Sequence, residues 1–355
     1  MAHSAAYWRK RSALLMYDRM EGAELVSADI ASLYQHAYNE VASRMGKIFS
    51  TYEKAFGLTD KEAMKLLNAL SDPGDMKALK KALTKLNNPA AQEVLAQLNA
   101  PAYAARINRL QELMTQVESI NRQLYSQDLA KQTRWYTGLA SDSYYRSVYD
   151  IQQEVGFQFS FKHIDKDLID KVMHSAWSGE TFSETLWHNV NGVTREVRKQ
   201  LSWGLITGKT ERQISKEIAN KYTVGAFESR RLVRTESCYL SNEMQFESYE
   251  ACGADRYQYV ATLDSKTDEE CGELDRKIFY VKDKQPGVNC PPMHPFCRCT
   301  TKIYIDQSTR SDMKRRARNP VTGRNEIVSA NVSYQQWAEQ NGLTKSKPKK
   351  KSQGK

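Results

Sequence analysis

The chain has 355 residues, a formal net charge of +10, 40% hydrophobic residues and 26% charged residues. This length suffices for two or three domains with a sizeable core. No stretch approaches the ~18 consecutive apolar residues of a membrane-spanning helix, so we expect a soluble protein with no membrane partner. The basic N-terminus is followed by only a short apolar run, Ala13–Met16, so we expect no cleavable signal peptide.

The positive charge is concentrated near the C-terminus. The last 50 residues hold 12 Lys and Arg against 4 Asp and Glu, so 8 of the 10 net positive charges lie there. The preceding residues are close to neutral. A contact with a polyanion that is predicted from net charge therefore belongs to this tail.

The first half of the chain has a helical pattern almost throughout. Apolar residues recur at steps of three and four from Tyr34 to Tyr52 and again from Leu110 to Leu124, which is typical of amphipathic helices. We expect Gly57 to end the first of these helices and Gly138 to interrupt the second. We interpret both apolar stripes as helix-bundle core; a dedicated partner-binding surface is the alternative.

Start and stop signals predict further helices. A Thr-x-x-Glu capping box at Thr59 opens the first of three short helices before Pro101. Similar boxes begin at Thr181 and Thr210, and Gly208 stands at a C-cap position between them. After Gly138, helices are expected at 141–155, 165–176, 182–206, 211–221 and 226–252.

After Gly253 the composition changes to that of strands, at 256–263, 277–281 and 298–305. The predicted fold class is mainly α, with extended helical N-terminal and middle regions, a small C-terminal α+β module containing a Cys/His loop, and a basic tail expected to be disordered. The predicted divisions are 1–138, 139–225, 226–305 and 306–355.

Cysteine and histidine cluster in the C-terminal module. All six cysteines follow residue 237, and four of them lie with His294 inside 29 residues. Thiolates and an imidazole can complete a tetrahedral zinc shell that staples a segment lacking its own core. No paired C-x-x-C motifs exist, because Asp268 stands where a second thiol would complete one. A metal site, a disulfide and reduced, packed cysteines all stay open, although the absence of a signal peptide argues against disulfides. The candidate metal ligands, with zinc as the candidate cofactor, are Cys271, His294, Cys297, Cys299, Cys290 and Asp268.

Carboxylates crowd the same segment and raise a catalytic alternative. Together with His294 they could bind a divalent metal and hydrolyse phosphodiesters. However, no Ser/His/Asp spacing, phosphate-cradling glycine loop or H-E-x-x-H helix is present. We therefore expect no enzymatic activity and assign no catalytic residue. The carboxylates are Asp264, Asp268, Glu269, Glu270, Glu273 and Asp275.

Arg234-Thr235-Glu236 lies within the long helix that precedes the strands. We interpret it as a polar helix face with an intrahelical or helix-to-sheet ion pair. A role in orienting the Cys/His loop is the alternative.

Together these motifs resemble the C-terminal signature of the Mu F-like phage head morphogenesis proteins, also called minor capsid or minor head proteins, in the form found in phages and prophages of Gram-positive bacteria. The resemblance spans about 180–305, and His-Pro-x-Cys-Arg-Cys after Pro-Pro is specific. Two positions depart from the family pattern. Asp268 replaces a cysteine, which weakens a four-thiolate site, and Arg276 replaces a turn glycine. The signature residues are Arg234, Thr235, Glu236, Asp264, Thr267, Cys271, Asp275, Pro291, Pro292, His294, Pro295, Cys297, Arg298 and Cys299.

The resemblance implies a low-copy virion component that associates with the portal and the capsid interior during head assembly in the host cytoplasm. The implied partners are the portal protein, the major capsid and scaffold proteins, and double-stranded DNA bound without sequence preference, with which some relatives leave the capsid. The helical part would dock on the portal or inner shell, and the Cys/His module would hold a compact interaction surface. The rival hypotheses are a metal-dependent nuclease or toxin-like effector, and a scaffolding factor absent from the mature virion.

The lysines at the end of the tail are the candidate DNA contacts. Clustered Lys without interleaved aromatic residues predicts salt-sensitive, sequence-independent phosphate binding. A solvated tail without a partner is the alternative. The candidate residues are Lys345, Lys347, Lys349, Lys350, Lys351 and Lys355.

Overall fold

The structure is a computed structural model that describes residues 3–49, 57–86, 88–306, 313–320, 322–329, 332 and 334–342. These residues are mainly helical, with short strands towards the C-terminus, which confirms the predicted fold class. None of the helices described has the length and apolar character needed to cross a bilayer.

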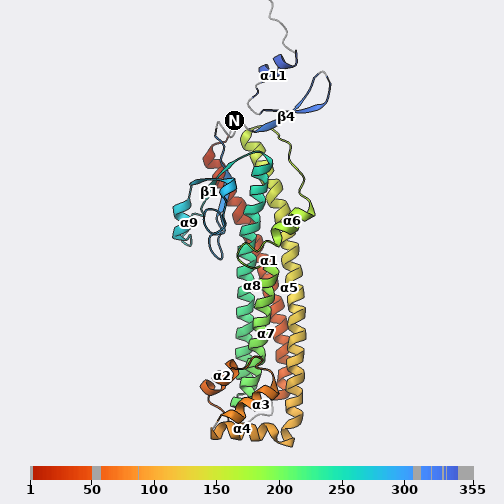
Figure 1. The fold of residues 1–355 in the computed structure, drawn as a ribbon, viewed down its shortest axis with the longest axis vertical. Helices are drawn as coiled ribbons and strands as arrows, with labels where there is room; N and C mark the ends of the chain where they lie inside the picture. The colour runs from red at the N-terminus through yellow and green to blue at the C-terminus, as the bar shows by residue number, and fades with distance from the viewer. Residues whose placement is uncertain are drawn as a thin grey trace, which may run out of the picture. The chain divides into compact units, whose positions relative to one another are not determined.

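The helices are shown in Figure 1. In chain order they are α1 (Ala5–Phe49), α2 (Asp60–Asn68), α3 (Met76–Lys85), α4 (Pro89–Asn99), α5 (Pro101–Val155), α6 (Lys166–Met173), α7 (Phe182–Thr207), α8 (Glu211–Ala251), α9 (Glu269–Leu274), the 3-10 helix η1 (Val281–Asp283) and α11 (Tyr334–Gln340).

The chain divides into two compact units that interleave along the sequence, because α1, α5 and α8 each contribute to both. The first unit comprises Met1–Arg19, Gly138–Val172 and Cys238–Lys355, and the second comprises Met20–Thr137 and Met173–Ser237. The predicted division of the chain at residues 138, 225 and 305 stays a prediction.

The second unit is a helix bundle, in which stretches of α1, α5, α7 and α8 run alongside one another and α2, α3 and α4 gather at one end (Figure 1). The predicted stripes lie in its core: Tyr34, Val41 and Met45 of α1 are buried there, as is the stripe from Leu110 to Leu124 of α5. Burying one such side chain contributes about 1.5–3 kcal/mol. The interpretation of these stripes as bundle core is confirmed. Tyr52 lies outside the described residues.

Two helices continue through glycines, contrary to expectation. The prediction that Gly138 ends a helix is wrong, because α5 runs past it to Val155. The expected helices 211–221 and 226–252 are one helix, α8, with Gly225 in its interior. A Cβ added at Gly225 would lie 2.5 Å from Val193 Cγ2 and 2.8 Å from the Tyr34 ring. This glycine therefore allows close helix packing, which outweighs the cost of about 1 kcal/mol for a helical glycine.

The predicted helix boundaries at capping boxes are confirmed. Thr59 and Thr181 each accept from the backbone N–H three residues later, and the glutamate there reaches back to the capping residue. Thr210 and Gln213 exchange the same pair of hydrogen bonds. Gly208 ends α7 with a φ of 69°, a left-handed conformation that glycine adopts without strain.

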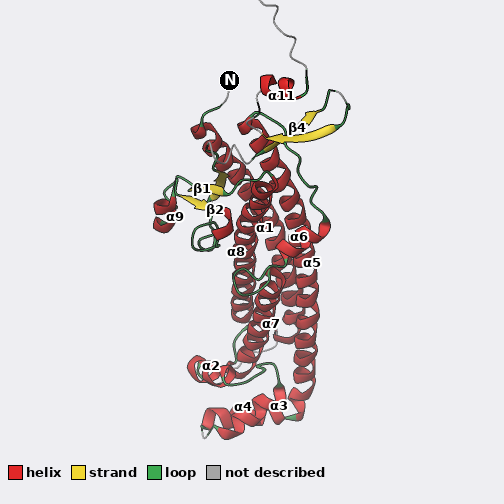
Figure 2. Cartoon of the chain, turned by 45° about the horizontal axis from the view of Figure 1, so that its top comes forward, coloured by secondary structure: helices red, strands yellow, loops and turns green. Residues whose placement is uncertain are grey.

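The first unit contains a three-stranded antiparallel sheet in the order β2-β1-β3 (Figure 2). Its strands are β1 (Arg256–Val260), β2 (Ile278–Tyr280) and β3 (Thr300–Ile303), each within a predicted strand segment. β1 is central, since Tyr257 pairs with Phe279 on one side and Ile303 on the other. Every residue of β3 is buried, and Lys302 Nζ lies 2.6 Å from Glu154 Oε1 of α5. The sheet thereby brings the cysteine-rich loop next to α8.

The sequence analysis expected the chain after residue 305 to be disordered, whereas the described residues of this segment include regular elements. β4 (Lys314–Arg318) and β5 (Asn325–Ser329) form an antiparallel hairpin, and α11 follows. The candidate DNA-binding lysines at 345–355 lie outside the described residues.

Candidate metal centre

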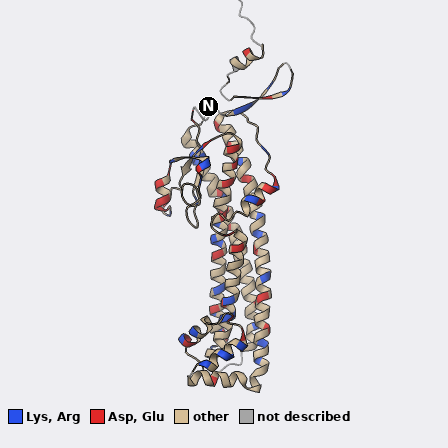
Figure 3. Cartoon of the chain, in the orientation of Figure 1, with Lys and Arg blue, Asp and Glu red and all other residues tan. Residues whose placement is uncertain are grey.

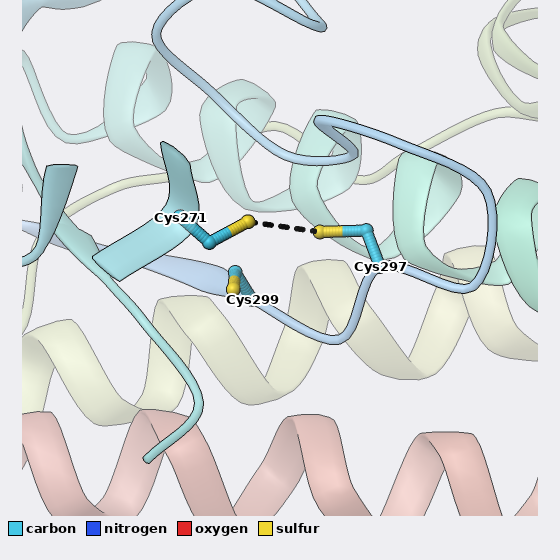
Figure 4. A group of neighbouring side chains, drawn as sticks. All are labelled: Cys271, Cys297 and Cys299. Atoms are coloured by element: carbon cyan, nitrogen blue, oxygen red, sulfur yellow. Dashed lines mark hydrogen bonds between the residues drawn. The ribbon is translucent and has the colours of Figure 1, made fainter. Parts of the chain in front are cut away.

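Three buried thiols gather in the first unit. The sulfur atoms of Cys271, Cys297 and Cys299 lie within 4.8 Å of one another (Figure 4), and those of Cys271 and Cys297 are 4.0 Å apart. Cys271 belongs to α9, and the other two precede β3. A tetrahedral zinc ion with Zn–S bonds of about 2.3 Å places its sulfur ligands about 3.8 Å apart. The spacing therefore fits three ligands of one zinc ion.

The three thiols interact strongly with one another. Hydrogen bonds from Cys271 and Cys297 lower the pKa of the Cys299 thiol, while the hydrogen bond with Cys297 raises the pKa of Cys271. One thiolate can therefore be stabilised by its two thiol neighbours. Three adjacent thiolates would repel one another, and a bound divalent cation would compensate for that repulsion.

His294 places an imidazole beside the thiols. Its Nε2 lies 3.5 Å from Cys271 Sγ, and its Nδ1 lies 2.8 Å from the carbonyl oxygen of Pro295. Because a carbonyl can only accept, Nδ1 must be the protonated nitrogen, which leaves the Nε2 lone pair facing Cys271. Metal-binding histidines commonly have this arrangement.

The other two predicted ligands do not join this group. Asp268 is the N-cap of α9, and its side chain accepts from Glu270 N at 3.1 Å. Cys290 is buried in the loop after η1, and burial raises the pKa of its thiol to about 12. These two residues have other contacts, so the structure groups three of the six predicted ligands, Cys271, Cys297 and Cys299, and places His294 beside Cys271.

The sequence analysis missed Cys238 of α8 as a neighbour of this cluster. Its Sγ lies 3.5 Å from the carbonyl oxygen of Cys299, and its hydrogen bond with Cys297 helps to raise the pKa of that thiol. Cys238 is far from the loop in sequence and lies within a helix, so no ligand spacing indicated its proximity.

Several signature residues hold the loop that carries Cys271. Arg298 donates to both oxygens of Asp264, at 2.6 and 2.9 Å, and this pairing lowers the pKa of Asp264. Asp275 Oδ1 accepts from Ala261 N at 3.0 Å, and Thr267 donates to the carbonyl of Thr262. The acidic residues of this segment thus organise the backbone. Among the described residues, they do not form a carboxylate group around His294.

The Arg-Thr-Glu motif has its contacts within the second unit. Arg234 pairs with Glu24 of α1, so the predicted intrahelical or helix-to-sheet ion pair is wrong in its partner. Glu236 is buried and accepts from Trp177 Nε1, at 3.0 and 3.2 Å to its two oxygens. Burial raises the pKa of Glu236 to about 7.

Comparison with known families identifies this region. Residues 195–302 match the family model described as Phage Mu protein F like protein. This part of the chain is similar to the Mu F-like phage proteins. The Mu F-like region runs from α7 to β3 and includes all three clustered thiols, as the sequence resemblance predicted.

A curated relative also matches. The NAD(+)--arginine ADP-ribosyltransferase EFV of Enterococcus faecalis (strain ATCC 700802 / V583) is 24% identical over 260 residues, covering 68% of this chain and 52% of that protein. The chain therefore spans about half the length of this relative. No solved structure matches the chain significantly.

Proposed function

We propose that the chain is a minor head protein that acts with the portal and the capsid interior during phage head assembly. The match of residues 195–302 to the Mu F-like family carries this proposal. The helical bundle would provide the docking surface for the portal or inner shell. The lysines at 345–355 would contact packaged DNA through its phosphates, and the protein would leave the capsid with the genome.

A binding experiment tests the portal part of this proposal. The full chain, immobilised by a tag, is incubated with the purified portal protein of the phage or prophage that encodes it. We expect specific retention of the portal, with no retention of the portal of an unrelated phage. Equal retention of both portals, or of neither, would contradict the assignment.

We further propose that Cys271, Cys297 and Cys299 bind a structural zinc ion, with His294 Nε2 as the fourth ligand. The 4.0 Å sulfur separation and the Pro295 contact of His294 support this assignment. Zinc would cross-link α9 to the segment that enters β3, and would thereby stabilise a module that has little regular secondary structure.

Two alternative enzymatic functions can be tested directly. The name of the E. faecalis relative describes NAD(+)-dependent ADP-ribosylation of arginine, and the acidic loop suggested a nuclease. Purified chain is incubated with plasmid DNA and Mg²⁺, Mn²⁺ or Zn²⁺, and separately with NAD(+) and an arginine-containing acceptor. The head-protein proposal predicts intact plasmid and unmodified acceptor. DNA cleavage that is lost in His294→Ala would favour the nuclease instead.

A further inference from the structure

The hairpin β4–β5 has one face that carries basic and uncharged residues. β4 has the sequence Lys-Arg-Arg-Ala-Arg, and side chains alternate between the two faces of a strand. Directly opposed residues share a face. This face includes the cross-strand pairs Lys314 with Ser329 and Arg318 with Asn325, and also Ile327 of β5. We call this set the outer face of the hairpin.

The outer face is accessible and has no acidic member. Lys314 and Arg318 are exposed, as are Ser329, Ile327 and Asn325 across from the strand. Within the described hairpin, no carboxylate lies directly opposite these cations. Arg324, in the connection between the strands, is exposed as well.

The opposite face of the hairpin carries Glu326 and contacts residues that follow β5. Glu326 accepts from Asn319 Nδ2 at 3.1 Å and from Trp337 Nε1 of α11 at 3.3 Å. Arg315, on this same face, donates to the carbonyl oxygen of Val332. The face with Arg315 and Glu326 thus contacts the chain that follows, whereas Arg318 of the outer face donates to the carbonyl oxygen of Gly323, in the connection between the strands, at 3.2 Å.

We infer that the outer face of β4–β5 binds the phosphates of double-stranded DNA, as a folded contact in addition to the lysines at 345–355. This inference rests on the proposed DNA contact and gives it a second location. The hairpin lies outside the Mu F-like region. The inference is therefore argued from the charge of the hairpin and the register of its strands, and not from the family match. Figure 3 shows the basic residues of β4 in blue.

Strand geometry suits a row of phosphates. Lys314 and Arg318 are four residues apart on an extended strand and therefore about 13–14 Å apart along it, because each residue advances about 3.3–3.4 Å. Arginine can also bind a phosphate through two N–H groups at once. A paired strand holds these cations in order before binding, so less conformational entropy is lost on contact.

An acidic protein surface is the competing partner. Protein interfaces are enriched in aromatic residues and depleted of lysine at their centres. Ile327 is the exposed large hydrophobic residue of the outer face, and the remaining described members are polar or charged. This composition favours the phosphate backbone of nucleic acid.

The test compares four forms of the full chain for binding to random-sequence duplex DNA between 50 and 200 mM salt. They are the unaltered protein, a hairpin variant (Lys314→Gln, Arg318→Gln, Arg324→Gln), a form lacking residues 345–355, and a matched control. The control (Lys61→Gln, Lys77→Gln, Lys81→Gln) removes the same charge from exposed positions on α2 and α3.

We expect the hairpin variant to bind about tenfold more weakly at 0.1 M salt, with a log–log salt slope reduced by about 2–3. The matched control should stay within twofold of the unaltered protein. A charge-retaining variant (Lys314→Arg, Arg318→Lys, Arg324→Lys) should bind DNA about as well as the unaltered protein, because it keeps all three positive charges.

Other outcomes separate the two claims. Loss of binding on removal of 345–355, together with an unaffected hairpin variant, would overturn the hairpin inference and leave the lysine contact in place. Equal losses in the hairpin variant and the control would attribute the effect to net charge and overturn it as well. Retention of the unaltered protein on immobilised polyglutamate but not on DNA would assign the surface to an acidic protein. If the unaltered protein binds no DNA at 50 mM salt, the proposed DNA contact fails altogether.

Discussion

Cys271 lies on α9 and Cys297 and Cys299 lie just before β3, yet their three sulfur atoms are buried together. The packing of β1 against β3 and the capping of α9 by Asp268 place them there. The sequence indicated a metal site in this loop but could not distinguish its ligands. Cys290 and Asp268 have equally suitable residue types, and only the folded loop separates them from the cluster.

The cluster gives a prediction about metal content. Protein purified without chelators should contain about one zinc per chain, because three thiolates and one imidazole complete a tetrahedral shell. Cys297→Ser should lose most of this zinc, whereas Cys290→Ser, in the same module but outside the cluster, should retain it. Elemental analysis measures both. Unchanged zinc content in Cys297→Ser would reject the proposed ligand set.

Removal of the metal provides a second readout for the same site. A strong chelator should lower the melting temperature of the unaltered protein and of Cys290→Ser, since zinc binds the folded module in preference to the unfolded chain. Cys297→Ser should melt at a lower temperature from the start and should not respond to the chelator. A zinc-free protein of undiminished stability would contradict the site.

Glu236 gives a prediction about pH. Its pKa is about 7 in the folded protein, against 4.5 ordinarily, because burial disfavours the carboxylate. Between these two values the unfolded chain has lost the proton that the folded protein retains. Stability should therefore decline from about pH 4.5 to pH 7, by about 2–3 kcal/mol from this residue.

Glu236→Gln isolates this effect, because glutamine can still accept from Trp177 without titrating. We expect the variant to be equally stable at pH 5 and more stable than the unaltered protein by about 2–3 kcal/mol at pH 8. Buried Asp128, whose pKa is raised to about 6 by burial, titrates in both proteins and cancels in the comparison. Denaturant unfolding at the two pH values measures the difference. A difference that does not change with pH would show that Glu236 is ionised throughout.

At the scale of helices, two glycines allow the effect of helix propensity on stability to be compared with the effect of packing. A Cβ at Gly192 of α7 would meet nothing within 4 Å, whereas one at Gly225 of α8 would overlap Val193 and Tyr34. We expect Gly192→Ala to stabilise the protein by about 0.5–1 kcal/mol. Gly225→Ala should destabilise it by about 1–2 kcal/mol, because the overlap outweighs the same gain in propensity.

Chemical denaturation measures both glycine variants. Stabilisation by Gly225→Ala equal to that by Gly192→Ala would show that α8 does not pack as closely as the structure has it.

The predicted helices succeeded where a local signal was strong and failed at glycines inside helices. The capping boxes at Thr59, Thr181 and Thr210 marked real boundaries, because their hydrogen bonds are made within one turn of the chain. Gly138 was predicted as a break because glycine favours helix ends, and the segments 211–221 and 226–252 were predicted as separate helices. At Gly225 the close contacts with Val193 and Tyr34, which a sequence does not show, explain a glycine inside α8, whereas a Cβ at Gly138 would meet nothing within 4 Å and a single glycine is simply tolerated within α5.

For the molecule as a whole, the sequence alone predicted the resemblance to the Mu F-like family, but it did not predict where the basic residues of the C-terminal segment lie in space. The order of signature residues from Arg234 to Cys299 predicted the Mu F-like region, and the family match confirms it. The excess of positive charge in the last 50 residues suggested a single contact through the final lysines. Strand pairing of β4 with β5 indicates a second basic surface, which required knowledge of the register.

The central claim is that the protein is a minor component of a phage head. Quantitative mass spectrometry of purified, DNA-filled particles from the phage or induced prophage that encodes it tests this most directly, with the portal protein as the internal copy-number standard. We predict that the chain is present at a few copies per particle, far below the major capsid protein. Its absence from mature particles, combined with its presence in precursor heads, would identify a scaffolding factor; its absence from both would contradict a role in the head.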